Sequence, residues 1–322
     1  MILHPNFNSE PLKFFHGIPS FVSDSDYTEG FGLQWITHSK TQLDSKTGLP
    51  ITKERMERML GSQLSFLRGK VVLEAGCGAG RFTEILLQNG AVVTAFDLSN
   101  SVIANFDNNG SNESLRIIQA SITNLPFSKE VFDLVFCPGV IQHTPNPKKS
   151  IESLYNQVKP GGHLIFDQYR FNISTLFRSA WIVRLVAKRL SPEKGLQFTD
   201  NLVKFWLPLH RQVKDKRLLE IALFRISPIT SHYSSYPEMS EHDQIQWAKL
   251  NTHDNLTDTY KRLTGPKKLL KILEQLGAVD IKLTIMPYTI EVSCQKPSSE
   301  QSRSESARIA IVKIKGRTVQ SG

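Results

Sequence analysis

The segment from Val71 to Phe82 constrains the fold of this chain more than any other segment. Lys70 to Ala75 has the apolar pattern of a strand that is covered on both faces, and a helix is expected to begin at Arg81. Between them, glycine occupies every second position from Gly76 onward. Glycines permit a tight turn and leave the main chain bare for a ligand, and the helix start adds unpaired N–H groups. The sequence therefore predicts a ligand site at the end of this strand.

The alternation of strands and helices continues well beyond this segment. Further strands are expected at Ala91–Phe96, Leu115–Gln119, Val131–Cys137, His163–Asp167, Ala278–Ile285 and Tyr288–Cys294. Helices are expected at Arg81–Asn89, Ser101–Phe106, Pro147–Val158 and Pro266–Leu276. Strands that alternate with helices indicate a sheet with helices on both faces. The predicted fold class is therefore α/β, with a doubly wound, mostly parallel sheet.

The regular alternation stops after Tyr169, and this break divides the chain. Phe171–Leu190 is expected as a basic amphipathic helix, whereas Phe205–Leu209 and Ile226–Tyr236 are expected to be irregular and aromatic. This region is interpreted as a mostly helical cap inserted between the fifth strand and the last helix, and Ala307–Val319 as an edge strand or a loose end. The predicted divisions are an N-terminal arm (1–52), the sheet domain (53–170 and 261–295), the inserted cap (171–260) and a C-terminal tail (296–322).

The glycine spacing distinguishes this turn from the dinucleotide-binding pattern. That pattern, G-x-G-x-x-G, would place its third glycine at position 81, where this chain has Arg81. The acidic Glu74, two residues ahead of Gly76, would repel a pyrophosphate and would suit a cationic group such as an amino-acid ammonium. A nicotinamide-dependent dehydrogenase is therefore disfavoured.

Other polar residues follow the later strands at the same edge of the sheet. Asp97 closes the second strand, where a carboxylate can accept hydrogen bonds from both hydroxyls of a ribose. The turn Ala120–Phe127 follows the third strand and can place a polar and an apolar residue against an adenine. Phe132–Pro147 holds the end of the fourth strand and the loop after it, and Val158–Gly162 is the turn that leads into the fifth strand. The set predicts a nucleoside site at this edge.

Together these motifs resemble the class I S-adenosylmethionine-dependent methyltransferases, and within them the small-molecule enzymes of the ubiquinone and menaquinone type. The resemblance covers about Lys70 to Tyr169, and Phe31–Asp44 and Trp247–Asp254 are similar to flanking segments of bacterial relatives. It implies a seven-stranded sheet with an antiparallel last strand, and S-adenosyl-L-methionine as the cofactor.

The resemblance also implies roles for individual residues. The expected cofactor-binding residues are Glu74, Gly76 and Gly78 for the methionine part, Asp97 for the ribose, Ser121 and Ile122 for the adenine, and Leu98. Many relatives have Asp where this chain has Ser121, which can still bond an adenine amino group but is a weaker acceptor.

His143 is the leading candidate for a general base, because it follows the fourth strand on the side where an acceptor would approach. Its alternative role is structural. His253 and Asp254 would form a base and its orienting partner only if the main chain brought their side chains together, since neighbours on a strand point apart. The methyl donor is already activated, so a base is needed only for an acceptor that is protonated at working pH.

Composition and charge limit the partners. The net charge is +9, and residues 171–322 hold 24 basic and 14 acidic side chains. A basic cap can face an acidic small molecule, an anionic membrane or nucleic acid. Its apolar and basic mixture favours a small-molecule, glycan or lipid-linked acceptor with an anionic or lipidic part. An RNA methyltransferase is the main alternative, although no RNA-binding module is recognised, and a non-catalytic S-adenosylmethionine-binding protein is the other.

The remaining features are mostly absences. The three cysteines, Cys77, Cys137 and Cys294, are far apart, which argues against a disulfide framework and the usual zinc site, so no metal is expected. No stretch approaches the roughly 18 apolar residues that span a membrane, and no secretory signal is recognised. A cytoplasmic location is the expectation, and the oligomeric state stays open.

Overall fold

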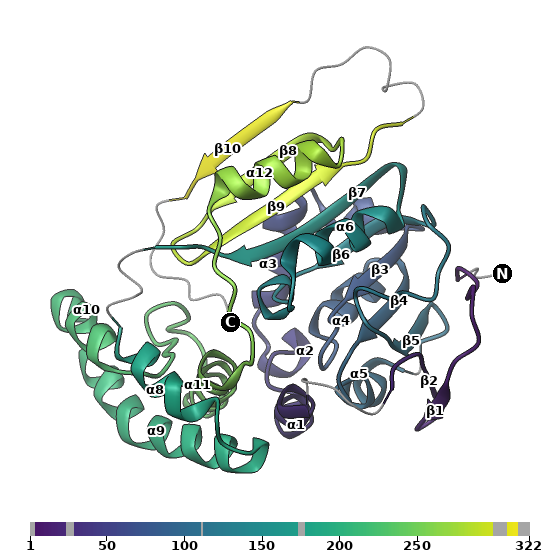
Figure 1. Ribbon diagram of the computed structural model, residues 1–322. Coiled ribbons are helices and arrows are strands. Elements are labelled where there is room, and N and C mark those ends of the chain that lie inside the picture. Colours follow the sequence, from purple (N-terminus) through teal and green to yellow (C-terminus); the bar gives the residue numbers. More distant parts are fainter. Residues whose placement is uncertain (1–3, 24–28, 111, 173–177, 299–307, 315–322) are drawn as a thin grey trace.

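The computed structural model describes residues 4–23, 29–110, 112–172, 178–298 and 308–314. Figure 1 shows one large twisted sheet with helices on both of its faces and a separate group of helices below it. The strands are β1 (Lys13–Phe15), β2 (Ile18–Ser20), β3 (Val71–Ala75), β4 (Val92–Asp97), β5 (Leu115–Gln119), β6 (Phe132–Cys137), β7 (Val158–Tyr169), β8 (Val279–Ile285), β9 (Thr289–Gln295) and β10 (Ile309–Lys313).

Seven of these strands form the predicted central sheet, in the order β5-β4-β3-β6-β7-β9-β8. All neighbours are parallel except that β9 runs antiparallel to both β7 and β8. The mostly parallel α/β fold with an antiparallel last strand is therefore confirmed. The chain moves outward from β3 to β5 and then returns to β6 on the other side of β3. Such a reversal opens a crevice at the carboxyl ends of the strands.

Three short strands extend the sheet to ten strands. β1 and β2 form a hairpin that pairs with β5 at one edge, and β10 runs parallel to β8 at the other edge. The sequence allowed either an edge strand or a loose end within Ala307–Val319, and Ile309–Lys313 forms an edge strand. The strands β1 and β2 have only three residues each, which is too short for a periodic signal in the sequence.

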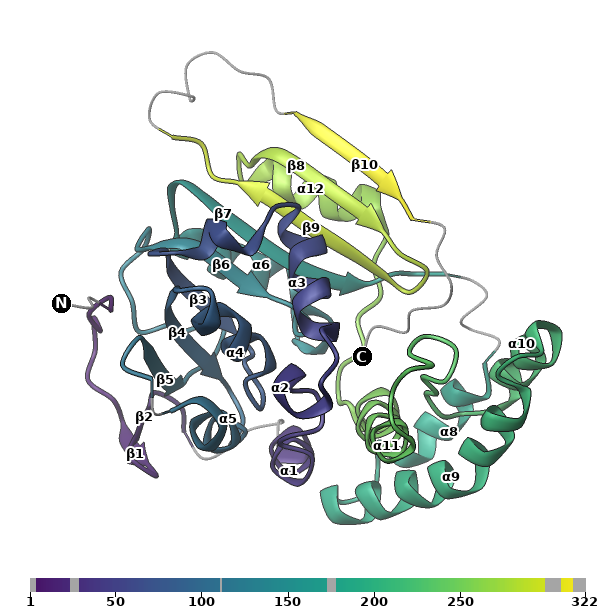
Figure 2. The same ribbon diagram turned by 180° about the vertical axis from the view of Figure 1, so that it is seen from behind.

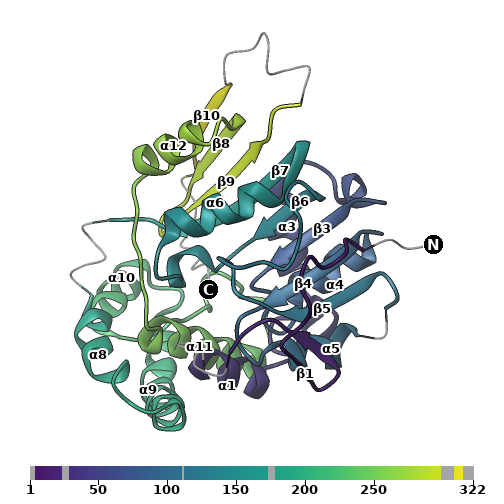
Figure 3. The same ribbon diagram turned by 45° about the vertical axis from the view of Figure 1, so that its right-hand side comes forward.

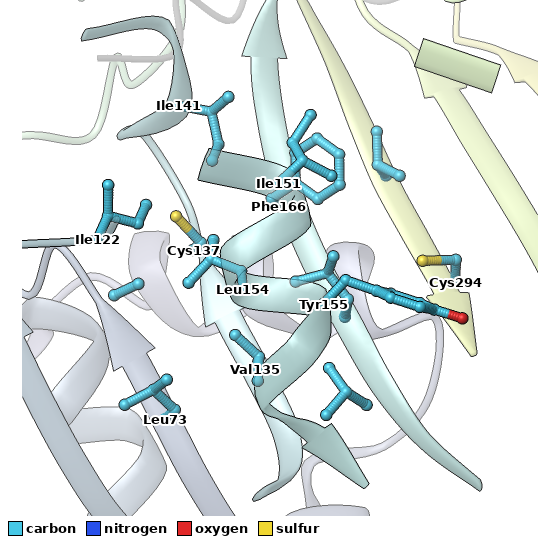
Figure 4. Close-up of a cluster of buried hydrophobic side chains, with 14 of the residues drawn as sticks. Leu73, Ile122, Val135, Cys137, Ile141, Ile151, Leu154, Tyr155, Phe166 and Cys294 are labelled. Atoms are coloured by element: carbon cyan, nitrogen blue, oxygen red, sulfur yellow. The ribbon is translucent and has the colours of Figure 1, made fainter. Parts of the chain in front are cut away.

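Helices cover both faces of the sheet, as its apolar strands require. On one face lie α3 (Ile51–Leu60), the short helix η1 (Leu64–Leu67), α4 (Arg81–Gln88) and α5 (Val102–Asn109), and on the other α6 (Pro147–Gln157) and α12 (Pro266–Gln275) (Figure 2). Each face has its own hydrophobic core. Figure 4 shows the core under α6 and α12, in which Ile151 and Leu154 of α6 pack against Val135 and Phe166 of the sheet. Both layers hold the strand ends in fixed positions.

The inserted region forms a helical cap beyond the carboxyl ends of the strands (Figure 3). Its helices are α8 (Ser179–Ala187), α9 (Pro192–Val213), α10 (Arg217–Ile226) and α11 (Glu241–Thr257), which packs along α9. The helices α1 (Glu29–Thr37) and α2 (Asp44–Thr47) of the N-terminal arm lie beside them, with α1 contacting both α9 and α11.

One expectation for the cap is wrong. Phe205–Leu209 was expected to be irregular, but it lies inside α9, with Pro208 within the helix. The helix continues because Val203, Leu207 and His210 recur on one buried face, so packing outweighs the cost of a proline in the interior. The exposed side of the same helix carries Phe205.

Candidate active site

A cleft of about 1140 Å³ opens where the sequence predicts a ligand site, at the carboxyl ends of β3 to β7. The ends of β4 and β7 and the turns that follow β3, β5 and β6 contribute residues to its wall. Of the eight predicted site residues, six line the cleft and two do not; the six are Gly76, Gly78, Asp97, Leu98, Ile122 and His143. The structure thus brings together side chains that are spread over about half the length of the sheet domain.

The glycine turn after β3 forms the floor of the cleft. The N–H of Gly76 donates to the carbonyl oxygen of Phe96 over 2.7 Å, and both Gly76 and Gly78 have positive φ, 70° and 52°. A Cβ atom on Gly76 would lie 2.2 Å from Cγ2 of Val140, and one on Gly78 would lie 3.3 Å from the ring of Trp35. Both conformation and space therefore require glycine here.

Asp97 is fixed at the end of β4 by three hydrogen bonds. Its Oδ1 accepts from the main-chain N–H and the hydroxyl of Ser99, at 2.9 and 2.8 Å, and its Oδ2 accepts from the N–H of Gly78 at 3.0 Å. A carboxylate offers about four lone-pair positions. Oδ2 uses one of them here, so the carboxylate keeps acceptor capacity for a ligand in the cleft.

Glu74 lies behind the glycine turn and is absent from the cleft wall. Its Oε2 accepts a hydrogen bond of 2.5 Å from the hydroxyl of Thr83, and the amide of Asn105 donates to the same hydroxyl. Burial raises the pKa of Glu74 to about 8, against the opposing effect of the Thr83 hydrogen bonds. The side chain is therefore mostly neutral at pH 7 and ties β3 to α4, which weakens its predicted role as partner of an ammonium group.

Ser121 is the other predicted residue outside the cleft wall. Its hydroxyl lies 3.1 Å from that of Thr123, within the turn that follows β5. The neighbouring Ile122 lines the cleft together with Leu98 and Phe96. These three side chains provide an apolar surface suited to a planar base, whereas the polar contact of Ser121 with the adenine stays a prediction.

Two arginines beside the glycine turn were missed from the sequence. Arg55, from α3, lies with its Nη2 2.6 Å from Oδ2 of Asp167, whose Oδ1 accepts from the N–H of Gly139. Arg81 donates from Nη1 to Oε1 of Gln42 over 2.7 Å, and burial followed by the charge of Arg55 lowers the pKa of Arg81 to about 9. Both side chains line the cleft, where they could hold a ligand carboxylate.

The two flanking segments that the sequence singles out meet at the cleft. The indole N–H of Trp247 donates to the carbonyl oxygen of Thr41 over 2.7 Å, and the Gln42 amide lies 3.3 Å from that of Asn251. Trp35, from the same arm, lines the cleft against the glycine turn. The arm and α11 thus complete a wall that the sheet alone leaves open.

Comparisons with known proteins agree with this geometry. Residues 73–166 match the model of the methyltransferase domain family. A ubiquinone biosynthesis O-methyltransferase of Pseudomonas fluorescens is 27% identical over 187 residues, which is 56% of this chain and 78% of that protein. Its counterpart in Coxiella burnetii is 32% identical over 128 residues, 38% of this chain and 55% of that protein.

Residues 73–166 of this chain are thus similar to a methyltransferase domain, as the resemblance of its motifs implies. The match to this family supports S-adenosyl-L-methionine as the cofactor. The match to the Coxiella relative spans about half of that protein's length. Among solved structures, a putative S-adenosyl-L-methionine-dependent methyltransferase from Methanococcus maripaludis has 12% identity and a TM-score of 0.46, over 86% of this chain and 97% of that one.

His143 lines the same cleft and lies in the short helix η2 (Ile141–His143) after β6. Its Nδ1 lies 3.0 Å from Oδ2 of the buried Asp258 and 3.3 Å from the carbonyl oxygen of Tyr260. Two oxygen acceptors beside Nδ1 assign the proton to that nitrogen, which leaves Nε2 with its lone pair. Burial lowers the pKa of His143, so the imidazole is neutral at pH 7.

The structure separates His253 from Asp254, which the sequence considered as a pair. Both lie on α11, but Nδ1 of the buried His253 contacts the Thr199 hydroxyl at 3.2 Å, away from the cleft. Asp254 lines the cleft instead, with its Oδ2 4.0 Å from Nε2 of His143. The acid of the considered pair thus faces a different histidine, because neighbours on a helix point in different directions.

Proposed function

We propose that this chain transfers the methyl group of S-adenosylmethionine to a hydroxyl group of a small-molecule acceptor, with His143 as the general base. The arrangement of His143 carries the proposal: the buried Asp258 lies at Nδ1, and Nε2 is left as a proton acceptor at the donor cleft. The O-methyltransferase names of the relatives support the same chemistry.

In the proposed step, the acceptor oxygen attacks the methyl carbon of the sulfonium in line with the bond to sulfur. The carbon–sulfur bond breaks, the carbon–oxygen bond forms, and S-adenosylhomocysteine leaves as a neutral sulfide. The hydroxyl proton passes to Nε2 of His143. Alignment of the two partners can supply about 7–11 kcal/mol of the barrier, and a base contributes about 10²–10⁴-fold.

The donor is proposed to lie along the carboxyl ends of β3, β4 and β5. Gly76 and Gly78 would contact the methionine part with bare main chain, and Asp97 would accept from the ribose hydroxyls. Ile122 and Leu98 would pack against the adenine. The Arg81 guanidinium beside the glycine turn would pair with the methionine carboxylate, a geometry that arginine suits.

The first experiment measures methyl transfer from labelled S-adenosylmethionine to a panel of acceptors. The panel holds dihydroxybenzoate, dihydroxybenzyl alcohol, an isoprenyl-substituted catechol, a sugar phosphate and an aromatic amine. The proposal expects methyl ethers from at least one hydroxyl acceptor. Transfer to the amine alone, or the same rate with His143→Gln, would contradict it.

We also propose that the cap contacts anionic membrane. The adjacent helices α8 and α10 expose large apolar side chains, among them Ile182 and Leu218 at 71% and 82% exposure. The same two helices and the residues at their ends also carry exposed basic side chains: Lys188, Arg189, Lys216, Arg217 and Arg225. Apolar and basic side chains on one surface favour the headgroup region of an anionic bilayer. None of the helices in the described ranges is long and apolar enough to cross a membrane.

Cosedimentation with lipid vesicles tests this contact. The chain should bind vesicles that contain phosphatidylglycerol and not those of phosphatidylcholine alone. Leu218→Asp should weaken binding, whereas Leu12→Asp, at a residue with 69% exposure far from the cap, should not. Equal binding to both vesicle types would count against an electrostatic contact.

A further inference from the structure

A second cavity, of about 800 Å³, adjoins the donor cleft. It lies between the end of β7 and the cap helices α8 and α11, and Tyr288, the residue before β9, also lines it. The cavity and the cleft have three wall residues in common: Tyr169, Asn251 and Asp254. A ligand could therefore reach from one space into the other.

Positive charge dominates the wall of this cavity. Four cationic side chains line it, from three separate parts of the chain: Arg170, Arg178, Arg184 and Lys261. The single carboxylate in the wall is Asp254. Arg184 also forms an ion pair with the buried Asp258 behind it. Even with both carboxylates counted, cations outnumber anions by four to two.

Neutral groups hold three of these cations in place. Arg178 donates to the carbonyl oxygens of Phe224 and Ile229, at 3.3 and 3.5 Å, and its guanidinium lies 3.7 Å from the centre of the Phe224 ring. Arg170 donates to the carbonyl oxygen of Met286 at 3.3 Å. Within the described ranges, no carboxylate lies within 4.0 Å of Arg170, Arg178 or Lys261.

Lys261 occupies the side of the cavity nearest the donor cleft. Its Nζ donates to the carbonyl oxygen of Asn255 at 3.0 Å and lies 5.2 Å from the centre of the Tyr169 ring. Burial, and then the charge of Arg184, lowers the pKa of Lys261 to about 7, against the opposing effect of Asp254. The ring of His143 also contacts Tyr169, with the two ring centres 5.5 Å apart.

Like charges that are gathered in a partly buried space destabilise the fold unless counter-charges accompany them. Burial likewise lowers the pKa of Arg178 to about 10, because the environment disfavours the charged form. An anion in the cavity would offset this cost. Arginine is suited to it, because its planar fork binds carboxylate and phosphate through two parallel hydrogen bonds.

We propose that this cavity binds an oxyanion of the methyl acceptor, a carboxylate or a phosphate, and so presents the acceptor's hydroxyl to His143. The inference rests on the proposed function, since it assigns the acceptor of that same site to an anionic class. Arg170 and Arg178 bind the anion, and the apolar body of the acceptor lies against Tyr169 and Trp181. Lys261 and Tyr169 mark the passage toward the donor.

Calorimetric titration of the chain without donor tests the cavity by itself. The probes are benzoate, phenyl phosphate and the neutral benzyl alcohol, and inorganic phosphate alone shows whether the aromatic body is needed. The two anions should bind at least tenfold more tightly than benzyl alcohol. Tighter binding of benzoate or of phenyl phosphate decides between carboxylate and phosphate. Anions that bind no better than the alcohol would overturn the proposal.

Two variants assign the binding to this cavity. Arg178→Gln should weaken benzoate or phenyl phosphate binding about tenfold. The matched control, Arg189→Gln, removes a guanidinium that lies exposed near the end of α8, outside the cavity, and should bind like the unchanged chain. If Arg178→Gln fails to fold, Arg170→Gln takes its place. Equal losses in the cavity variant and the control would overturn the proposal.

A separate titration with S-adenosylhomocysteine distinguishes a failure of the anion-site proposal from a failure of the proposed methyltransferase function. Donor-product binding that persists in Arg178→Gln, while anion binding falls, supports both proposals. Donor-product binding without any anion binding overturns the acceptor class and leaves the methyltransferase proposal standing. In the methylation assay, Arg178→Gln should raise KM for dihydroxybenzoate about tenfold and leave KM for dihydroxybenzyl alcohol nearly unchanged.

Discussion

The donor cleft and the cationic cavity lie side by side but are built in different ways. The cleft is shaped by main chain: the glycine turn after β3 and the strand ends that carry Asp97 and Ile122. The cavity is shaped by side chains that come from the end of β7, from α8 and α11, and from the segments after α11 and before β9. A site of the first kind leaves a local trace in the sequence, and a site of the second kind leaves almost none.

The two spaces also differ in charge. The cleft wall mixes carboxylates, such as Asp97 and Asp167, with the guanidinium groups of Arg55 and Arg81. S-adenosylmethionine itself carries an ammonium, a sulfonium and a carboxylate, so a mixed wall suits it. The cavity wall is mostly cationic, which suits an anion and would repel the sulfonium. The difference in wall charge thus favours the donor in the cleft and an anionic acceptor in the cavity. The substitutions below test that division.

The largest expected effect follows the loss of the base. His143→Gln should lower kcat by about 10²–10⁴-fold, because Nε2 can no longer take the acceptor proton, while S-adenosylhomocysteine binds nearly as before. Rates of methyl transfer to dihydroxybenzoate measure the effect. His242→Gln, at an exposed residue of α11, is the matched control. A loss of less than about threefold would remove His143 from the mechanism.

The second effect separates the two carboxylates of the donor motif. Asp97→Asn should weaken S-adenosylhomocysteine binding by roughly 10- to 100-fold, because a charged acceptor is worth more than a neutral amide. Glu74→Gln should change it by less than about threefold, since Glu74 is already mostly neutral and lies outside the cleft wall. Calorimetry on both variants measures the difference.

The opposite result would reverse the interpretation of this motif. If Glu74→Gln weakened binding more than Asp97→Asn did, the acid behind the glycine turn would contact the donor. The thermal stability of each variant provides the control. Glu74 accepts a hydrogen bond from Thr83, and a substitution that removes this bond between β3 and α4 can destabilise the fold.

The smallest effect is a pH dependence that runs in opposite directions in the two spaces. Lys261, with its pKa near 7, is charged below that value, so benzoate affinity should fall a few-fold from about pH 6 to about pH 8. The pKa of His143 lies below its usual 6.5, so kcat should instead rise with pH through the acid range and then level. The charged groups that face Lys261 are Arg184, Arg178 and Asp254.

Lys261→Met identifies the group responsible. This variant should bind benzoate more weakly at low pH and with little dependence on pH, while the acid limb of kcat stays in place. A benzoate affinity that still fell with pH in Lys261→Met would assign the titration to another group.

Much of the sheet and the donor cleft could be predicted because their signals are local. Strands such as Leu115–Gln119 show as short apolar runs, and the turn at Gly76 shows as a spacing that sterics demand. The role of Glu74 could not be judged this way, since its neutrality depends on burial by elements that come later in the chain. Position in a motif is local information, and protonation state is not.

The rest of the site depends on long-range packing. Arg55 reaches Asp167 across 112 positions of sequence, and Asp254 reaches His143 only because α11 packs over the sheet edge. The helical course of Phe205–Leu209 likewise depends on burial against the neighbouring cap residues. The basic composition of the cap indicated an anionic partner, but only the fold shows that Arg170, Arg178 and Lys261 line one cavity.

One paired titration tests the division between the two spaces most directly. S-adenosylhomocysteine and benzoate are titrated separately into the unchanged chain, Asp97→Asn and Arg178→Gln. We expect Asp97→Asn to lose affinity for S-adenosylhomocysteine alone and Arg178→Gln to lose affinity for benzoate alone. If each substitution weakened both ligands equally in folded protein, or neither did so, the separate donor and acceptor sites would be contradicted.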